Sequence, residues 1–168
     1  MKKTSNDDRL EQVKRLLDTV CDPEIPVLTI GDLGILRDVV LHEDGAVEVV
    51  ITPTYSGCPA MNAIEVNIRA VLQEEGFDNV IVTTVLRPAW TTDWLSAEGR
   101  RKLNAFGIAP PAGASLDKRA LLGESHILKC PHCGSTNTEM IAAFGSTACK
   151  ALFRCLDCLE PFDYFKCH

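Results

Sequence analysis

The sequence has few aromatic side chains, few basic ones and no long apolar segment, and each shortage excludes a class of protein. Aromatic residues make up 6% of the 168 residues, which is too few for a base-stacking surface. The 17 Lys and Arg are outnumbered by 23 Asp and Glu, and the net charge of -6 opposes binding to a phosphate backbone. No apolar run approaches the roughly 20 residues of a membrane-spanning helix. We therefore expect binding neither to nucleic acid nor to a membrane.

The N-terminal residues lack the apolar segment of a secretory signal. Met-Lys-Lys is followed by the polar segment TSNDD. This pattern predicts a cytoplasmic protein. In a reducing compartment, the 8 cysteines are expected to be metal ligands or reactive thiols rather than disulfides.

The positions of the cysteines divide the chain into two parts. The first part contains Cys21 and Cys58, and the remaining six cysteines lie near the C-terminus. A stretch rich in Gly and Pro separates them and interrupts any periodic structure. We expect a first domain at residues 1–106, a linker at residues 107–128 and a second domain at residues 129–168.

Hydrophobic periodicity in the first domain predicts three helices and three strands. Helices are expected at residues 10–20, 59–75 and 97–106, and strands at residues 35–41, 46–52 and 80–86. Asp44-Gly45 between the first two strands is typical of a hairpin turn. Trp90 and Trp94 are expected in the core, and a docking rim is the alternative. The order of elements indicates an α+β fold, a small layer sandwich.

Cys58 lies between an apolar strand and an amphipathic helix, in the segment TPTYSGCPA. Pro59 fits the first helical position, which puts Cys58 at or beside the N-cap. Unpaired amides and the helix dipole there favour the thiolate, which can attack an electrophile or bind a soft metal. A buried structural cysteine is the alternative.

The loop that precedes the first strand carries two carboxylates, Asp22 and Glu24, which lie on either side of Pro23 in the sequence. One interpretation places a carboxylate near Cys58, where it binds a metal or handles a proton. The other is a helix terminator with solvated acidic residues. Cys21 ends the helix just before this loop and is a second candidate thiol, although packing is its simpler role.

Two Cys-x-x-Cys pairs in the second domain have the spacing of a zinc ribbon. Two thiolates three positions apart can share one tetrahedral ion, and two pairs complete its shell. Because the domain is too short to bury a core of its own, we expect a structural zinc ion to fold it. An iron-sulfur cluster is the rival occupant. The proposed ligands are Cys130, Cys133, Cys155 and Cys158, and the roles of Cys149, Cys167, His132 and His168 are left open.

The side chains around these cysteines suggest how the ribbon is neutralised and what it contacts. Four basic residues adjoin cysteines and could offset the charge of a four-thiolate centre: Lys129, Lys150, Arg154 and Lys166. The ribbon is expected to dock on protein rather than nucleic acid, because acidic residues outnumber basic ones and aromatic residues are available. These aromatic residues are Phe144, Phe153, Phe162, Tyr164 and Phe165.

Long segments of the chain resemble known families. DPEIPVLTIGDLGIL and TPTYSGCPA resemble the iron-sulfur cluster assembly domain shared by eukaryotic cytosolic iron-sulfur targeting factors and bacterial iron-sulfur maturation proteins. PAWTTDWLSAEGRRKL and FGSTACKALFRCLDCLEPFDYFKC extend the resemblance to the D components of bacterial phenylacetyl-CoA ring epoxidase systems. This resemblance implies a non-catalytic role in aerobic phenylacetate degradation, with the oxygenase and reductase components as partners. The eukaryotic relatives lack the ribbon and imply nothing about its contacts.

The resemblance also implies roles for particular residues. It implies that Cys58 is the reactive cysteine and that Asp22 and Glu24 form the acidic loop. Thr52 and Thr54 correspond to its threonine-bearing strand. The chain would then help to insert or repair a cofactor, with Cys58 as a transient ligand of iron or of an iron-sulfur cluster. An integral epoxidase subunit without cofactor transfer is the alternative, and a thiol enzyme is disfavoured because no histidine has an obvious pairing role.

Overall fold

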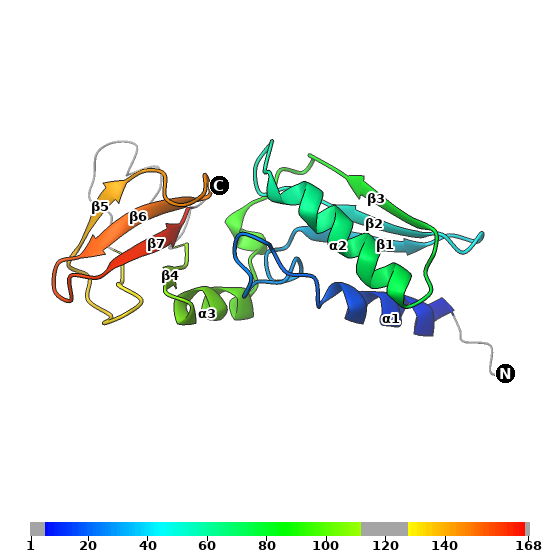
Figure 1. The fold of residues 1–168 in the computed structure, drawn as a ribbon, viewed down its shortest axis with the longest axis horizontal. Helices are drawn as coiled ribbons and strands as arrows, with labels where there is room; N and C mark the ends of the chain where they lie inside the picture. The colour runs from blue at the N-terminus through cyan, green and yellow to red at the C-terminus, as the bar shows by residue number, and fades with distance from the viewer. Residues whose placement is uncertain (1–5, 112–127, 167–168) are drawn as a thin grey trace. The chain divides into compact units, whose positions relative to one another are not determined.

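The computed structural model describes residues 6–111 and 128–166 of the chain. The chain divides into two units, Met1–Trp90 and Thr91–His168, whose elements are shown in Figure 1. Within the described ranges, no helix has the length and apolar character needed to cross a bilayer.

The first unit is a three-stranded sheet with two helices packed on one face (Figure 1). Its elements are α1 (Asn6–Leu17), β1 (Leu36–Leu41), β2 (Val47–Ile51), α2 (Ala60–Glu74) and β3 (Val80–Thr84). β1 pairs antiparallel with β2, and β2 pairs parallel with β3. α2 is therefore the crossover that a parallel connection requires.

The core of this unit lies between the sheet and the two helices. Residues along β2 alternate between buried and half-buried, as a strand with one face on a core should. The helices contribute side chains at helical spacing, which confirms the periodic pattern seen in the sequence. The buried residues of these elements include Val47, Val49 and Ile51 from β2, Val13 and Leu17 from α1, and Ile64, Ile68 and Leu72 from α2.

Local chemistry explains where these elements begin and end. The expected hairpin turn is present between β1 and β2, with Gly45 at a φ of 86° and a 2.9 Å hydrogen bond from the His42 amide to the Ala46 carbonyl. α1 ends at Leu17, before the expected end at residue 20. The hydroxyl of Thr19 donates to the carbonyl of Leu16 at 2.6 Å and competes there with continued helix.

The second unit contains a four-stranded sheet in the order β4-β7-β6-β5. Neighbours pair antiparallel except β4 and β7, which pair parallel. α3 begins after the expected cap, Ser96, whose hydroxyl accepts the Gly99 amide at 2.8 Å. The elements are η1 (Thr92–Trp94), α3 (Ala97–Ala105), β4 (Ile108–Ala109), β5 (Thr138–Ala142), β6 (Lys150–Cys155) and β7 (Pro161–Phe165).

α3 and β4 pack with the second unit. Arg100 on α3 donates to the carbonyls of Thr92 and Pro111 at 2.8 Å and 2.9 Å, and β4 adds to the ribbon sheet. The sequence placed α3 in the first domain and residues 107–128 in a linker, because an apolar pattern predicts an element but not the sheet on which it packs. Residues 112–127 of that stretch lie outside the described residues.

Trp90 is a core residue of the first unit, as expected. Its side chain is 4% exposed, and its indole N–H donates to the carbonyl of Leu33 at 2.8 Å. Trp94, in the second unit, is half-buried. The buried indole thus ties the end of the first unit to the loop that precedes β1.

Replacing Trp90 should measure how much the hydrogen bond from its indole to Leu33 contributes to stability. Trp90→Phe removes the indole donor and leaves the buried carbonyl of Leu33 without it. We expect the free energy of unfolding to fall by about 1–3 kcal/mol, measured by urea denaturation followed by circular dichroism. Val66→Ala, at a residue that is 63% exposed, is the control and should change it by less than about 0.5 kcal/mol. Equal losses in the two variants would contradict the assignment.

Candidate functional site

Cys58 lies in the turn that joins β2 to α2. Gly57, with a φ of 85°, supplies a left-handed conformation that glycine adopts without strain. Pro59 is the N-cap residue of α2 and has no side-chain hydrogen bond that caps it. The amide of Cys58 donates to the carbonyl of Tyr55 at 3.2 Å, and the thiol is half-buried. The expected position of Cys58 beside the N-cap is confirmed.

The loop after α1 brings two carboxylates near the Cys58 thiol. Asp22 is 7% exposed, and its Oδ1 accepts the amides of Glu24 at 2.7 Å and Ile25 at 2.9 Å. The amide of Asp22 donates to the carbonyl of Leu28 at 2.9 Å, and this hydrogen bond joins the two ends of the loop. The charges of Glu24 and Asp22 both act on Cys58. The loop is therefore more than a helix terminator, because it holds acidic groups close to the thiol.

The Cys58 thiol has a raised pKa, contrary to the expectation that the helix terminus would hold it as a thiolate. Burial is the main cause. The amide of Ala60 lowers the pKa by a hydrogen bond, but the negative charges of Glu24 and Asp22 raise it further. Burial and the two carboxylates thus outweigh the helix terminus. The raised pKa therefore favours the protonated form of the Cys58 thiol.

Tyr55 is a site residue that sequence reasoning missed. Its side chain forms a hydrogen bond with the Cys58 thiol that lowers the thiol pKa. The sequence could have indicated this role, because Tyr55 lies three residues before Cys58 in the segment TPTYSGCPA. The turn at Gly57 lies between the two residues.

Thr52 and Thr54 lie in the segment between β2 and Cys58, and both are buried, at 1% and 9% exposed. The amide of Thr52 donates to the carbonyl of Ile35 at 2.9 Å, whereas the Thr52 Oγ1 has no hydrogen-bond partner. A buried hydroxyl without a partner is uncommon and marks a place where a bound group can supply one. The role of the two threonines toward Cys58 stays a prediction.

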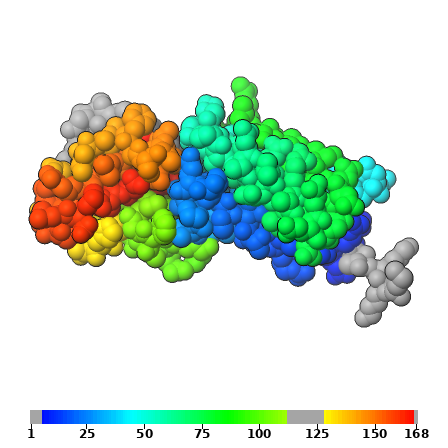
Figure 2. Space-filling view, viewed as in Figure 1, coloured from blue at the N-terminus to red at the C-terminus, as the bar shows by residue number. Residues whose placement is uncertain are grey.

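Cys21 lines a hollow beside α2. The loop after α1 forms one side of this hollow, and Asn67, Ala70 and Val71 of α2 form the other. Figure 2 shows the surface of α2 with this loop beside it. Asp22 also lines this hollow, and its charge acts on Cys58.

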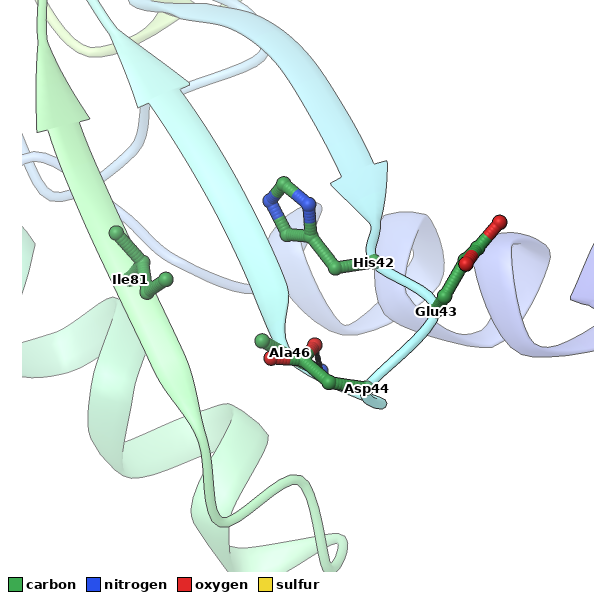
Figure 3. A pocket seen from close by; sticks show the side chains of 5 residues that line it. All are labelled: His42, Glu43, Asp44, Ala46 and Ile81. Carbon is green, nitrogen blue, oxygen red and sulfur yellow. Dashed lines mark hydrogen bonds between the residues drawn. The ribbon is translucent and has the colours of Figure 1, made fainter.

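A second hollow lies at the turn between β1 and β2, at the opposite end of β2 from Cys58 (Figure 3). His42 borders it, with Nε2 3.1 Å from Glu48 Oε2. The hydroxyl of Thr83 donates to Glu48 Oε1 at 2.7 Å, and these two hydrogen bonds lower the Glu48 pKa. Since His42 is engaged with Glu48, we assign no reaction to this hollow. It is lined by His42, Glu43, Asp44, Ala46 and Ile81.

The four cysteines of the two Cys-x-x-Cys pairs come together in the second unit. Their sulfur atoms all lie within 4.8 Å of one another. The Cys130 and Cys158 sulfurs are 3.8 Å apart, and those of Cys133 and Cys155 are 3.6 Å apart. A tetrahedral ion with metal–sulfur bonds of about 2.3 Å holds its sulfurs about 3.8 Å apart. The geometry therefore fits one metal ion bound by four thiolates.

This group is the one cluster of its kind in the described part of the chain. No other set of three or more His, Cys, Asp or Glu within residues 6–111 and 128–166 brings its ligand atoms so close. Cys58 and the acidic loop thus do not form a second closed metal site.

Within the four-cysteine group, the pKa of Cys155 is lowered, whereas the pKa values of Cys133 and Cys158 are raised. The amides of Cys158 and Asp157 donate to Cys155 and lower its pKa to about 7. At Cys158 the amide of Glu160 acts in the same direction, but burial and the neighbouring thiols together raise the pKa to about 12. A divalent cation removes this conflict, because it favours the thiolate at every position.

The basic residues beside the cysteines are engaged with other groups. Lys150 Nζ lies 3.7 Å from Asp163 Oδ2, Arg154 pairs with Glu139, and Lys166 donates to a backbone carbonyl at 3.0 Å. The expectation that basic residues neutralise the metal site finds no support at these three positions.

The aromatic residues of the ribbon form a core instead of the expected docking surface. The Phe153 ring stacks on Phe162 at 5.9 Å and meets Tyr164 edge-on at 5.8 Å, in a cluster that includes Cys130 and Cys155. The expectation was wrong for these three residues, because their positions on β6 and β7 bury them. The unit therefore has a small core built around two of the four cysteines. Four of the five aromatic residues, Phe153, Phe162, Tyr164 and Phe165, are buried, and Phe144 is exposed.

The other cysteines and histidines of the ribbon lie outside the four-cysteine group. Cys149 is buried, with its sulfur 3.0 Å from Thr147 Oγ1, and His132 is exposed. Cys167 and His168 lie outside the described residues.

Comparison with known proteins supports both halves of this description. Residues 10–83 match the family described as "Iron-sulfur cluster assembly protein", and residues 114–166 match the "PaaD zinc beta ribbon domain". A protein of Escherichia coli (strain K12), named as the D component of a "Putative 1,2-phenylacetyl-CoA epoxidase", is 48% identical over 162 residues, which cover 95% of this chain and 93% of the relative.

Two further relatives resemble part of the chain. The "Fe-S protein maturation auxiliary factor" of Porphyromonas gingivalis is 36% identical over 94 residues, which cover 55% of this chain and 89% of that protein. The crystal structure of a "Domain of Unknown Function DUF59" from Bacillus anthracis is 25% identical and aligns with a TM-score of 0.54, over 58% of this chain and 92% of that one.

Removing the metal should unfold the ribbon. Structural zinc centres supply about 10–16 kcal/mol of binding free energy at pH 7, and this small core depends on it. Chelation should therefore abolish the strand signal of the second unit in circular dichroism. Because protons compete with the metal for the thiolates, the amount of bound metal should decrease as the pH falls. Elemental analysis measures this loss, and Cys149→Ser, outside the group, should keep its metal. A ribbon that stays folded without metal would contradict the assignment.

The raised pKa of Cys58 should appear in its alkylation rate. Iodoacetamide reacts with thiolates, so modification of the Cys58 peptide, followed by mass spectrometry, should reach half its maximal rate above the pH of an unperturbed thiol. Glu24→Gln removes a negative charge and should shift this midpoint to lower pH. Glu11→Gln, on α1, is a control for a general change in charge and should leave it unchanged. An unshifted midpoint in the Glu24 variant would exclude the carboxylate as a cause.

Proposed function

Because this chain belongs to the family of the 1,2-phenylacetyl-CoA epoxidase D components, we propose that it matures the metal cofactor of the epoxidase system. In this proposal it inserts or repairs iron or an iron-sulfur cluster in the oxygenase or reductase component, in the cytoplasm. It holds no catalytic centre itself. The match of residues 10–83 to an iron-sulfur cluster assembly family supports a cofactor role over a purely structural one.

The observation that carries the proposal is a single half-buried thiol beside two carboxylates. Iron is the cargo. Cys58 gives its proton to solvent when the ion binds, and the charges of Asp22 and Glu24 then attract the cation instead of opposing the thiolate. Thiolate and carboxylate together accept iron.

The same site is suited to releasing its cargo. One thiolate and two carboxylates leave coordination positions that a client protein can fill with its own ligands. Burial of the protonated thiol also favours the empty state once the ion leaves. We propose that the buried hydroxyl of Thr52 and the neighbouring Thr54 line this site, where Thr52 Oγ1 would hydrogen-bond a water or sulfide that accompanies the cargo.

The ribbon has a different task in this proposal. Four thiolates complete a tetrahedral shell and leave no position for exchange, so Cys130, Cys133, Cys155 and Cys158 hold a permanent ion. We propose zinc rather than an iron-sulfur cluster, because the sulfur spacing fits a single ion. The folded ribbon then contacts the oxygenase or reductase component.

Replacement of the single thiol tests the proposal. In cells that carry Cys58→Ser, the purified oxygenase or reductase component should contain less than about half its normal iron, because hydroxyl is a far weaker iron ligand than thiolate. Elemental analysis and absorption spectra of each component measure the loss. Cys21→Ser, the other half-buried cysteine of this unit, is the matched control and should leave the iron content normal.

The same strains separate the proposal from its alternative. If the chain is an integral subunit without a transfer role, the components of the Cys58→Ser strain will carry normal iron, and the chain will remain in the purified complex at a fixed ratio. That result would exclude cofactor delivery. The stability of the purified Cys58→Ser protein, compared with the unmodified chain, shows whether the substitution acts through folding.

A further inference from the structure

We propose that the second metal knuckle of the ribbon is a docking knob for a partner protein. The docking knuckle consists of residues 155–160, and its contact residue is Leu159. The partner presents an apolar pocket with basic side chains on its rim. The inference rests on the proposed function for the identity of the partner, which is the oxygenase or reductase component. It does not require that Cys58 binds a metal.

Leu159 combines an unfavourable backbone conformation with an exposed side chain. Its φ is 64°, and it is the one non-glycine residue with a positive φ in the described ranges. A branched side chain is disfavoured in this region. The Leu159 side chain is also 69% exposed, so packing offers little compensation. Strained positions of this kind occur where a side chain serves a contact rather than the fold.

The first metal knuckle shows which residue the fold itself prefers at this place. The position after Cys133 is Gly134, with a φ of 77°, and it corresponds to Leu159 after Cys158. Both knuckles therefore need a left-handed residue after their second cysteine. Glycine meets that need without strain, whereas leucine adds an apolar side chain to the surface.

The docking knuckle is held rigid before any partner binds. The amide of Leu156 donates to the carbonyl of Asn137 at 2.8 Å, and the side chain of Asn137 donates to the Asp157 carboxylate at 2.7 Å. The hydroxyl of Ser135 donates to the same carboxylate. A preorganised contact loses little conformational entropy on binding. Leu156, which is 40% exposed, adds a second apolar side chain to the knuckle.

The charge of the docking knuckle selects the class of partner. Asp157 and Glu160 are both exposed and place two carboxylates beside the apolar side chain of Leu159. Nucleic acid and anionic lipid would be repelled by these carboxylates. A second copy of the chain, with a net charge of -6, would be repelled as well. A protein with a basic rim around an apolar pocket complements both features.

Binding measurements on the full-length, metal-loaded chain test the inference. The probes are the purified oxygenase component and the purified reductase component, each immobilised separately. Leu159→Gly should weaken binding to one of them by about tenfold or more, because a buried leucine is lost. The thermal midpoint and metal content of this variant should be undiminished, because glycine suits the backbone. Leu86→Ala, at a leucine of the first unit that is 61% exposed, is the control and should bind normally.

The electrostatic part of the inference has its own measurement. Glu160→Gln should bind more weakly than the unmodified chain at low ionic strength, and the difference should shrink as salt is added. Equal affinity of the two proteins at low salt would contradict the inference that the partner has basic side chains around its pocket.

Several results would overturn the docking role. Unchanged binding by Leu159→Gly, or no binding of the unmodified chain to either component, would do so. Self-association of the chain that disappears in Leu159→Gly would assign the knuckle to a second copy. Cys58→Ser should keep full affinity for the partner. Suppose that the Cys58→Ser variant lowers the iron content of the oxygenase or reductase component while the Leu159→Gly variant binds normally. The docking inference is then wrong, and the proposed function is supported.

Discussion

Burial and nearby negative charge oppose the ionisation of a thiol, and this constraint acts at Cys58 and at Cys158 of the ribbon. At Cys58 the opposing charges come from Asp22 and Glu24. In the ribbon, burial and the neighbouring thiols together raise the Cys158 pKa to about 12, whereas backbone amides lower that of Cys155 to about 7. A divalent cation bound by the four thiols would remove this conflict, and we propose the same for a cation at Cys58.

The two sites differ in how completely the protein surrounds the ion. Four sulfurs within 4.8 Å of one another leave no open position, and two of these cysteines belong to a buried aromatic cluster. Metal and core are therefore formed together in the ribbon. The single thiol of Cys58, in a turn between a strand and a helix, leaves most of a coordination shell to other ligands. In the proposed function, the chain thus combines a permanent metal site in the ribbon with an exchangeable one at Cys58.

The sequence predicted the elements that depend on local chemistry and missed properties that depend on packing. The helix after Cys58, the Asp44-Gly45 turn and the four-cysteine group follow from spacing and turn residues, and the structure confirms them. The protonation of Cys58 could not be predicted, since burial and the charge of Glu24 are set by a loop distant in sequence. The inward position of Phe153 was equally hidden until its strand was paired.

The burial of the ribbon's aromatic residues changes where a partner can bind. Because Phe153 and its neighbours form the core, the exposed apolar surface of the ribbon is provided by other side chains, among them Leu156 and Leu159 of the knuckle and Met140, Ile141 and Phe144 outside it. Cys155 and Cys158 are the first and fourth residues of this knuckle, and both belong to the four-cysteine group. An ion bound by that group would fix the segment at two points. Loss of the metal would release both the core and the knuckle. If the knuckle is the docking site that we propose, recognition of the partner depends on metal loading of the ribbon.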